Sequence, residues 1–304
     1  MRVRKAVFPV AGLGIRFLPA TKCVPKEMLP VVDKPLIQYA VEEAKAAGIE
    51  QFILVNRLGK GMLEDYFDHA PDLEATLRAK GSDEMLEVVL NTKAATGAVV
   101  ATRQMEYLGL GHAVWCAREL VGDEPFAVIL PDDLLLARKP VLQQMVEVFA
   151  KVQDPLAAVM AVARDQTRKY GVLDLAKEDA GDWEDGGPIG GIVRPRGLVE
   201  KPAPADAPSR LAIIGRYILT PDIFPLLENQ ERGAGGEIQL TDALVTLLAH
   251  RPFFGYRFEG ERFDCGDKAG YQMANLAFAM EIPNLRARIA PFIAERASHW
   301  GVGR

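Results

Sequence analysis

Short apolar runs alternate with amphipathic stretches along the first half of the chain. Val3–Val10, Gln51–Asn56 and Phe126–Leu130 are apolar runs typical of buried strands. Leu36–Gly48 and Val141–Lys151 space their apolar residues as amphipathic helices do. Strands that alternate with helices predict a largely parallel, twisted sheet covered on both faces. Sheets of this kind bind ligands beyond the carboxyl ends of their strands.

Shorter runs predict four further elements in the first half. We expect strands at Leu86–Leu90 and Ala98–Arg103, and helices at Lys60–Asp68 and Gly111–Glu119.

The second half of the chain changes character. It holds β-like runs with few helices between them, which predicts antiparallel additions to the sheet; they lie at 157–163, 171–175, 191–200 and 211–219. The acidic, glycine-rich stretch 177–190 predicts a solvated hairpin loop, and the proline-rich stretch 202–209 an exposed excursion. Helices return at Thr241–His250 and from Lys268 onward. The expected fold class is therefore α/β, with a mixed, mostly parallel sheet flanked by helices, β-insertions and C-terminal helices.

Composition narrows the class of protein. The 304 residues are 49% hydrophobic and 25% charged, as in an average globular protein. A net charge of -5 argues against a general nucleic-acid binder, and no apolar run reaches the roughly 18 residues of a membrane span. The N-terminal sequence MRVRKAVFPVAG lacks the apolar region of a signal peptide. The three cysteines form no CxxC motif. We expect a soluble cytoplasmic protein with no nucleic-acid or membrane partner.

The loop at residues 11–30, AGLGIRFLPATKCVPKEMLP, combines glycines, prolines and cations directly after the first strand. A dinucleotide-binding GxGxxG motif would need glycine at position 17, which is Phe17, and no Walker A motif is present. Backbone N–H groups at Gly12 and Gly14 nevertheless suit anionic oxygens, and Arg16 and Lys26 supply positive charge. Composition alone leaves two alternatives open, a polyanion-binding loop and an ordinary surface loop.

An ordered set of motifs decides between them. The segments GLGIRFLPAT (12–21) and PKEMLP (25–30) are followed by DKPLIQYAVEEA (33–44), GLGHAV (109–114), LPDDLL (130–135), VEKP (199–202), AIIGRYIL (212–219), GGEIQLTDAL (235–244) and FDCGDKAGY (263–271). Together they resemble the sugar-phosphate nucleotidyltransferases, and within that family its uridylyl branch. The resemblance covers nearly the whole chain in order.

The resemblance implies the reaction and the organisation of the chain. The phosphate oxygen of glucose 1-phosphate would attack the α-phosphorus of UTP and expel pyrophosphate, giving UDP-glucose. One nucleotidyltransferase domain would span residues 1–304, with a nucleotide-binding half at about 1–135, a sugar-phosphate half at about 136–266 and C-terminal helices at about 267–304. The family also forms homo-oligomers, so we expect a dimer or tetramer.

The catalytic residues expected from the resemblance are cations. The nucleophile is already an anion at neutral pH, so the chemistry needs groups that bring two polyanions together rather than a general base. Arg16 and Lys26 would hold the triphosphate, with the backbone of Ala11, Gly12 and Gly14. Lys201, which by sequence alone is a solvated lysine at a strand end, would meet the sugar phosphate.

Two aspartates are candidates for a Mg²⁺ site. Asp132 follows the apolar run FAVIL and a proline, where a carboxylate either binds metal or caps the next helix. The resemblance selects Asp132 as a Mg²⁺ ligand, with Asp264 as its partner. Asp133 is interpreted as a neighbour, and Asp267 as the start of the next helix.

The remaining candidates would bind the base and the sugar. A glutamine amide donates and accepts at once, as the edge of uracil requires, so Gln104 is the candidate for base recognition. Gly109, Gly111 and His112 complete the nucleotide-binding set implied by the resemblance. The sugar-binding set is Gly171, Glu200, Gly215 and Glu237, in which the glycines would leave room for the hexose ring.

One position departs from the family pattern. Ile15 stands where the family has threonine or serine, which removes a hydroxyl contact worth about 0.5–1.5 kcal/mol. Two rivals therefore stay open. The chain could be a glucose-1-phosphate thymidylyltransferase, because one glutamine does not exclude the thymine methyl group. It could also be a non-catalytic paralogue that binds nucleotide sugar.

Overall fold

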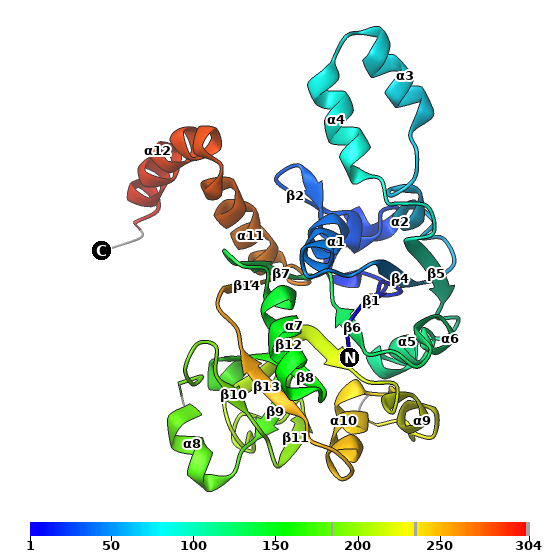
Figure 1. The fold of residues 1–304 in the computed structure, drawn as a ribbon. Helices are drawn as coiled ribbons and strands as arrows, with labels where there is room; N and C mark the ends of the chain where they lie inside the picture. Colours follow the sequence, from blue (N-terminus) through cyan, green and yellow to red (C-terminus); the bar gives the residue numbers. More distant parts are fainter. Residues whose placement is uncertain (184, 234–235, 302–304) are drawn as a thin grey trace.

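The computed structural model describes residues 1–183, 185–233 and 236–301. Within these ranges the main feature is a ten-stranded sheet (Figure 1). Its strands are β1 (Lys5–Pro9), β4 (Gln51–Asn56), β5 (Val99–Arg103), β6 (Phe126–Ile129), β8 (Leu156–Ala161), β9 (Gly171–Asp174), β10 (Ile192–Val193), β11 (Gly197–Glu200), β12 (Leu211–Leu219) and β13 (Phe254–Arg257).

The strand order is β10-β13-β8-β12-β6-β1-β4-β5, with β9 joining β12 and β11 joining β9. The strands β5, β4, β1 and β6 are parallel neighbours. Because β12 is antiparallel to both β6 and β8, and β13 is parallel to β8, six of the eight strands in this order run the same way. The prediction of a mixed, mostly parallel sheet with antiparallel additions is confirmed.

Helices cover both faces of the sheet. One face packs against α1 (Leu36–Ala46), α2 (Met62–Asp65) and α7 (Val141–Val152). The other packs against α5 (Leu110–Trp115), α6 (Arg118–Val121), α9 (Ile223–Glu228) and α10 (Leu240–Leu248). The strand β12 is buried along its whole length and pairs with β6, so the two halves of the chain share one sheet.

A smaller structural unit closes one end of the sheet. It consists of two antiparallel strand pairs, β2 (Pro30–Val31) with β3 (Lys34–Pro35) and β7 (Asp133–Leu136) with β14 (Glu261–Asp264). Buried Val31, Leu134, Phe263 and Cys265 form its apolar centre. This pairing brings the segment after β6 beside the segment before α11 (Lys268–Glu281), although they are far apart in sequence.

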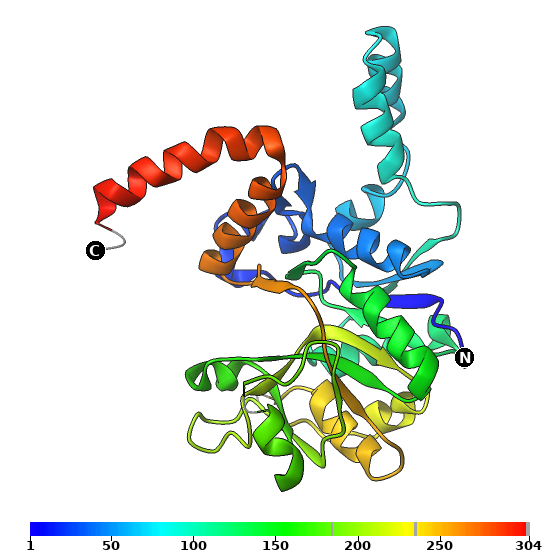
Figure 2. The ribbon, with the colours of Figure 1, turned by 60° about the vertical axis from the view of Figure 1, so that its left-hand side comes forward.

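Two helical extensions project from the body of the molecule (Figures 1 and 2). The first is the pair α3 (Pro71–Ala79) and α4 (Asp83–Thr92), and the second is α12 (Pro283–Trp300), which follows α11. No helix in the described ranges is long and apolar enough to span a membrane.

Two sequence predictions were wrong. Leu86–Leu90 is not a strand but part of α4, because Leu86 and Leu90 lie one helical turn apart in a longer amphipathic pattern. The stretch 177–190 is not only a loop, since it contains α8 (Lys177–Trp183). Trp183 is buried against the sheet, and this apolar anchor explains the helix amid acidic neighbours. The stretch 202–209 contains no helix or strand, as expected.

Candidate active site

A cleft of about 460 Å³ opens beyond the carboxyl ends of the central strands. A smaller pocket of about 220 Å³ lies beside it, between the glycine loop and Gly266, and Arg16 lines both. The cleft brings together all of the candidates for sugar and metal binding; its lining includes Arg16, Asp132, Gly171, Glu200, Lys201, Gly215, Glu237 and Asp264. The smaller pocket is lined by Gly12, Gly14, Arg16, Lys26 and Gly266, among others.

The glycine loop folds as three short 3₁₀ turns, at Ile15–Phe17, Ala20–Lys22 and Lys26–Met28. Gly14 has a φ of 67°, a left-handed conformation that favours glycine. The hydroxyl of Thr21 donates to the Gly14 carbonyl at 2.7 Å. These turns leave Gly12 and Arg16 exposed at the pocket while Ala11 is buried beneath them.

The two candidate metal ligands converge at Gly266. A Cβ atom on Gly266 would lie 2.9 Å from Asp132 Oδ2, 3.1 Å from Asp264 Oδ1 and 2.7 Å from an Arg16 guanidinium nitrogen. Glycine is therefore the residue that allows these three side chains to approach one another. Asp267, next in the segment, accepts hydrogen bonds from Ala269 and Gly270 and caps α11, as predicted.

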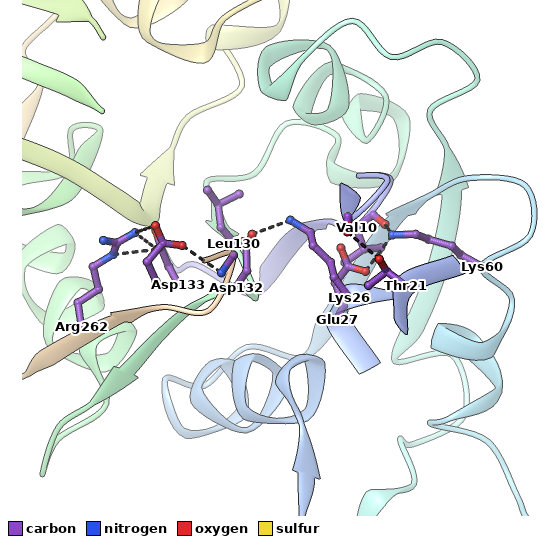
Figure 3. A network of polar contacts seen from close by, with 12 residues as sticks. Val10, Thr21, Lys26, Glu27, Lys60, Leu130, Asp132, Asp133 and Arg262 are labelled. Atoms are coloured by element: carbon purple, nitrogen blue, oxygen red, sulfur yellow. Dashed lines mark hydrogen bonds and ion pairs between the residues drawn. The ribbon is translucent and has the colours of Figure 1, made fainter. Parts of the chain in front are cut away.

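Lys26 points from the glycine loop toward Asp132 (Figure 3). Its ammonium donates to Asp132 Oδ2 at 2.6 Å. Burial alone would raise the pKa of Asp132, but the Lys26 ammonium outweighs it and holds that pKa below its ordinary value. For Lys26, burial opposes the charge, yet Asp132 and Glu27 raise its pKa. Both groups are therefore ionised at neutral pH, and each stabilises the other.

The neighbouring carboxylate, Asp133, has a structural role. Its Oδ1 accepts hydrogen bonds from Arg262, one of them from Nε at 2.8 Å. Its Oδ2 accepts from the Gly215 backbone N–H at 2.7 Å. Arg262 also donates to the Tyr170 hydroxyl at 2.7 Å. Asp133 thereby ties β12 and β14 together beneath the cleft, which agrees with its interpretation as a neighbour of the metal ligand.

The donor set suits a magnesium ion that is shared with a bound phosphate. Mg²⁺ takes one or two carboxylates from the protein and keeps waters and phosphate oxygens as its other ligands. Asp132 and Asp264 present two carboxylate oxygens around one point, at the junction of the cleft and the smaller pocket. No cluster of three or more metal-ligating side chains occurs among the described residues, so these two carboxylates fit Mg²⁺ better than a metal caged by protein alone.

The candidate sugar side of the cleft is built around Glu200. Lys201 Nζ lies 3.0 Å from Glu200 Oε1, and the Thr241 hydroxyl donates to Glu200 Oε2 at 2.7 Å. A Cβ on Gly171 would lie 2.8 Å from the Thr241 hydroxyl. The absent side chain at Gly171 thus makes room for a contact between protein groups, and Gly215 likewise accommodates Asp133 and Leu130. The space at these glycines is filled by the protein, although both still line the cleft.

The candidates for base recognition lie away from the cleft wall. Gln104 is 7% exposed, and its amide nitrogen donates to the Gly109 carbonyl at 3.0 Å and lies 3.1 Å from His112 Nδ1. Gly111 donates to the Ile238 carbonyl. Gln104 therefore supports the 109–112 segment in this structure, while His112 lines a different pocket with Trp115. That segment contacts the sugar side, because a Cβ on Gly109 would meet Glu237 at 2.7 Å.

Several contributors to the site were missed by the sequence analysis. Thr241, Tyr170 and Arg262 line the cleft, and Lys60 contacts Glu27 next to the loop. One signal was available for Arg262, a charged residue within the β-run ERFD that leads into Asp264. For Lys60 there was none, because its partners are set by the tertiary fold.

Comparison with known proteins places this geometry in a family. The sequence pattern of the family described as nucleotidyl transferase matches residues 5–280. A UTP–glucose-1-phosphate uridylyltransferase of Komagataeibacter xylinus is 52% identical over 88% of this chain and 90% of that protein.

Solved structures agree with the sequence comparison. A UTP-bound UGPase of Acinetobacter baumannii superposes with a TM-score of 0.86 at 41% identity, over 96% of this chain and 99% of that one. A UDP-glucose pyrophosphorylase in complex with UDP-glucose superposes with a TM-score of 0.78 at 42% identity, over 92% of this chain and 99% of that one.

Proposed function

The chain belongs to the nucleotidyl transferase family, and we propose that it transfers a uridylyl group from UTP to glucose 1-phosphate. A phosphate oxygen of glucose 1-phosphate forms a bond to the α-phosphorus of UTP. The bond between that phosphorus and the bridging oxygen to the β-phosphate breaks, and pyrophosphate leaves. UDP-glucose is the second product.

The observation that carries this proposal is the placement of three cations around the cleft and the smaller pocket beside it. Arg16 and Lys26 border the pocket at the glycine loop, and Lys201 lies on the opposite, sugar side. Two polyanions that meet between them have their mutual repulsion offset by fixed positive charge. The nucleophilic phosphate is already ionised, so the site needs no general base.

The residues take distinct roles in this proposal. The backbone of Gly12 and Gly14, with Arg16 and Lys26, holds the triphosphate, and Lys201 orients the phosphate of glucose 1-phosphate. Glu200 and Glu237 accept hydrogen bonds from the sugar hydroxyl groups. Support comes from their position on the cleft wall and from the UTP and UDP-glucose complexes of the similar structures.

Asp132 and Asp264 are proposed to hold Mg²⁺. When bound there, the ion neutralises charge that develops on the phosphate oxygens. Before an ion binds, Lys26 keeps Asp132 ionised, and the Gly266 backbone N–H, which donates to Asp264 Oδ1 at 3.0 Å, orients the second carboxylate.

Uracil recognition is assigned to the 104–112 region as a whole. Because the amide nitrogen of Gln104 is bonded to Gly109, base binding requires either the backbone of this segment or a rotation of that amide. The similarity to uridylyltransferases at 52% identity favours UTP over dTTP.

The activity is tested by pyrophosphate release from the purified protein with glucose 1-phosphate and Mg²⁺. We expect release with UTP to exceed release with dTTP, CTP, ATP and GTP, and to stop when EDTA removes the metal. A preference for dTTP would overturn the base assignment and keep the mechanism. Binding of UDP-glucose without release from any nucleotide would instead identify a non-catalytic paralogue.

A homo-oligomer in the cytoplasm is also proposed. The helix α12 projects from the body (Figure 2), and within its described residues none is buried. Phe292 is 54% exposed and Trp300 67%, and apolar groups of this size on a projecting helix are typical of a subunit contact. Light scattering should give a dimer or tetramer, and Phe292→Asp should shift the population toward smaller species. A monomer at micromolar concentration would contradict the proposal.

A further inference from the structure

Lys60 is a buried lysine outside the cleft, in the turn between β4 and α2. Its exposed fraction is 8%. Its ammonium donates to the backbone carbonyl of Val10 at 2.7 Å and to Glu27 Oε2 at 2.9 Å (Figure 3). Burying an ammonium is costly unless it is paired and hydrogen-bonded. Lys60 meets both conditions through its two acceptors.

The two acceptors of Lys60 flank residues 11–26, the first sixteen residues of the glycine loop. Val10 is the residue before the loop, at the end of β1, and Glu27 directly follows Lys26. The sixteen residues between them carry the whole set of loop groups assigned to the triphosphate. One ammonium therefore bridges the start of the loop and its last turn, and it offsets part of the entropy lost when residues 11–26 are closed into a loop.

The hydrogen bonds inside the loop are local by comparison. Phe17 donates to the Gly14 carbonyl, Lys22 to the Pro19 carbonyl and the Thr21 hydroxyl to the Gly14 carbonyl. The longest of these spans seven positions. They shape individual turns, whereas the Lys60 contacts connect the loop ends to each other through a residue of another segment.

Glu27 transmits the position of Lys60 to Lys26. The two neighbours face opposite ways, Lys26 toward Asp132 and Glu27 toward Lys60 (Figure 3). Glu27 is 1% exposed, and its second oxygen, Oε1, is buried with no hydrogen-bond partner among the residues that the structure describes. Burial raises the pKa of Glu27 and lowers the pKa of Lys60, so each charge depends on the other. Without Lys60, the carboxyl group would protonate or turn toward solvent, and the 3₁₀ turn Lys26–Met28, which carries both residues, would lose this anchor.

We propose that Lys60 is a positioning residue for the uridylyl transfer. By bonding Val10 and Glu27 together it holds the glycine loop on the sheet and aims Lys26 at Asp132. This rests on the proposed function, because that function assigns the loop to the triphosphate. Lys60 does not line the cleft or the smaller pocket, so it acts through the loop and touches no substrate.

The test compares three full-length variants. Lys60→Met removes the bridge and leaves Glu27 unpaired, and Lys60→Met/Glu27→Met removes the bridge and the unpaired charge together. Gln144→Met is the matched control, because Gln144 is 6% exposed and donates to the carbonyls of Lys139 and Glu259, away from the loop. All three exchange buried polar groups for methionine of similar size.

We expect Lys60→Met to lower kcat/KM about 10- to 100-fold, as a displacement of about 1 Å does in an active site. The KM for UTP should rise more than the KM for glucose 1-phosphate. The double variant should recover part of the lost Tm, because removing both partners is less costly than removing one, while kcat/KM stays low. Gln144→Met should lower Tm and leave both KM values unchanged. Full recovery of kcat/KM in the double variant, or an equal kinetic loss in Gln144→Met, would overturn the proposal.

Hydrogen exchange followed by mass spectrometry tests the same idea without substrate. In both Lys60 variants, amide exchange across residues 11–26 should accelerate at least about tenfold, while exchange in β8 and β12 stays at the wild-type rate. Unchanged exchange across 11–26 would refute the positioning role even in an active enzyme. Faster exchange in the variants, combined with no UTP turnover by the wild-type protein, would instead refute the proposed function and leave the structural role of Lys60 supported.

Discussion

Two lysine–carboxylate pairs border the cleft, and they are constructed differently. Lys26 and Asp132 are 106 positions apart, lie 2.6 Å from each other and have side chains 19% exposed. Lys201 and Glu200 are consecutive residues, 3.0 Å apart, and the Lys201 side chain is 45% exposed. The first pair exists only once the sheet and the glycine loop are assembled. The second forms locally at the end of β11.

The two lysines therefore differ in how firmly their ammonium groups are held before a ligand binds. Lys26 is held in position before a ligand arrives, and a preorganised charge stabilises a transition state without further reorganisation. Lys201, with its exposed side chain, is free to turn from Glu200 toward a phosphate. If Lys201 is removed, Glu200 still accepts a hydrogen bond from Thr241. If Lys26 is removed, Asp132 loses the ammonium that is bonded to it. Loss of either lysine should therefore harm catalysis, but only the loss of Lys26 should harm the fold.

Lys26→Ala should have the largest effect. We expect kcat/KM to fall about 10³-fold, at the upper end for a single electrostatic group. Because a half-buried carboxylate loses the ammonium that is bonded to it, the free energy of unfolding should fall by about 1.5–3 kcal/mol. Steady-state kinetics and denaturant unfolding measure the two quantities. Lys34→Ala is the control, since the exposed Lys34–Glu42 pair, 2.7 Å apart, lies in a different part of the surface. If the control lost as much stability as Lys26→Ala, the contrast between buried and exposed pairs would not hold.

Lys201→Ala should rank second, with a kinetic effect only. The expected loss in kcat/KM is about 10²-fold, and the KM for glucose 1-phosphate should rise more than the KM for UTP. An exposed pair contributes about 0–1 kcal/mol to stability, so the unfolding midpoint should stay near that of the wild type. A kinetic loss below about tenfold would count against the role of Lys201, and a clear loss of stability would erase its difference from Lys26.

The sequence predicted features that depend on one segment better than it predicted contacts between distant segments. The apolar periodicity gave the parallel strands, and the position of Asp132 after a buried strand placed it at the ligand-binding edge. The glycine loop was located from its own residues, although its function needed the family resemblance. These features are local, because each depends on one segment and its place at the end of a strand.

The remaining parts depend on contacts between distant segments. The approach of Asp132 and Asp264 follows from the pairing of β7 with β14, which no local pattern specifies. The burial of Gln104 is a tertiary feature too: its side chain is 7% exposed and its amide nitrogen bonds Gly109, while its contact with the base stays a prediction. The strand predicted at Leu86–Leu90 failed for a different reason, which is local. There a short β-like window was embedded in a longer helical pattern, and the longer pattern determined the structure.

Ile15→Thr should have the smallest effect. It tests only the pocket at the glycine loop, where Lys26 lies. Ile15 begins the first 3₁₀ turn of the glycine loop, lines the smaller pocket and is 68% exposed. A hydroxyl at this position would gain one hydrogen bond to the triphosphate, worth about 0.5–1.5 kcal/mol, so the KM for UTP should fall about two- to tenfold. The KM for glucose 1-phosphate should not change, because the sugar side does not reach this pocket. Ile15→Val, which keeps an apolar side chain of similar shape, should leave both values unaltered. An equal improvement in Ile15→Val would mean that reduced bulk, and not the hydroxyl group, limits UTP binding at the loop.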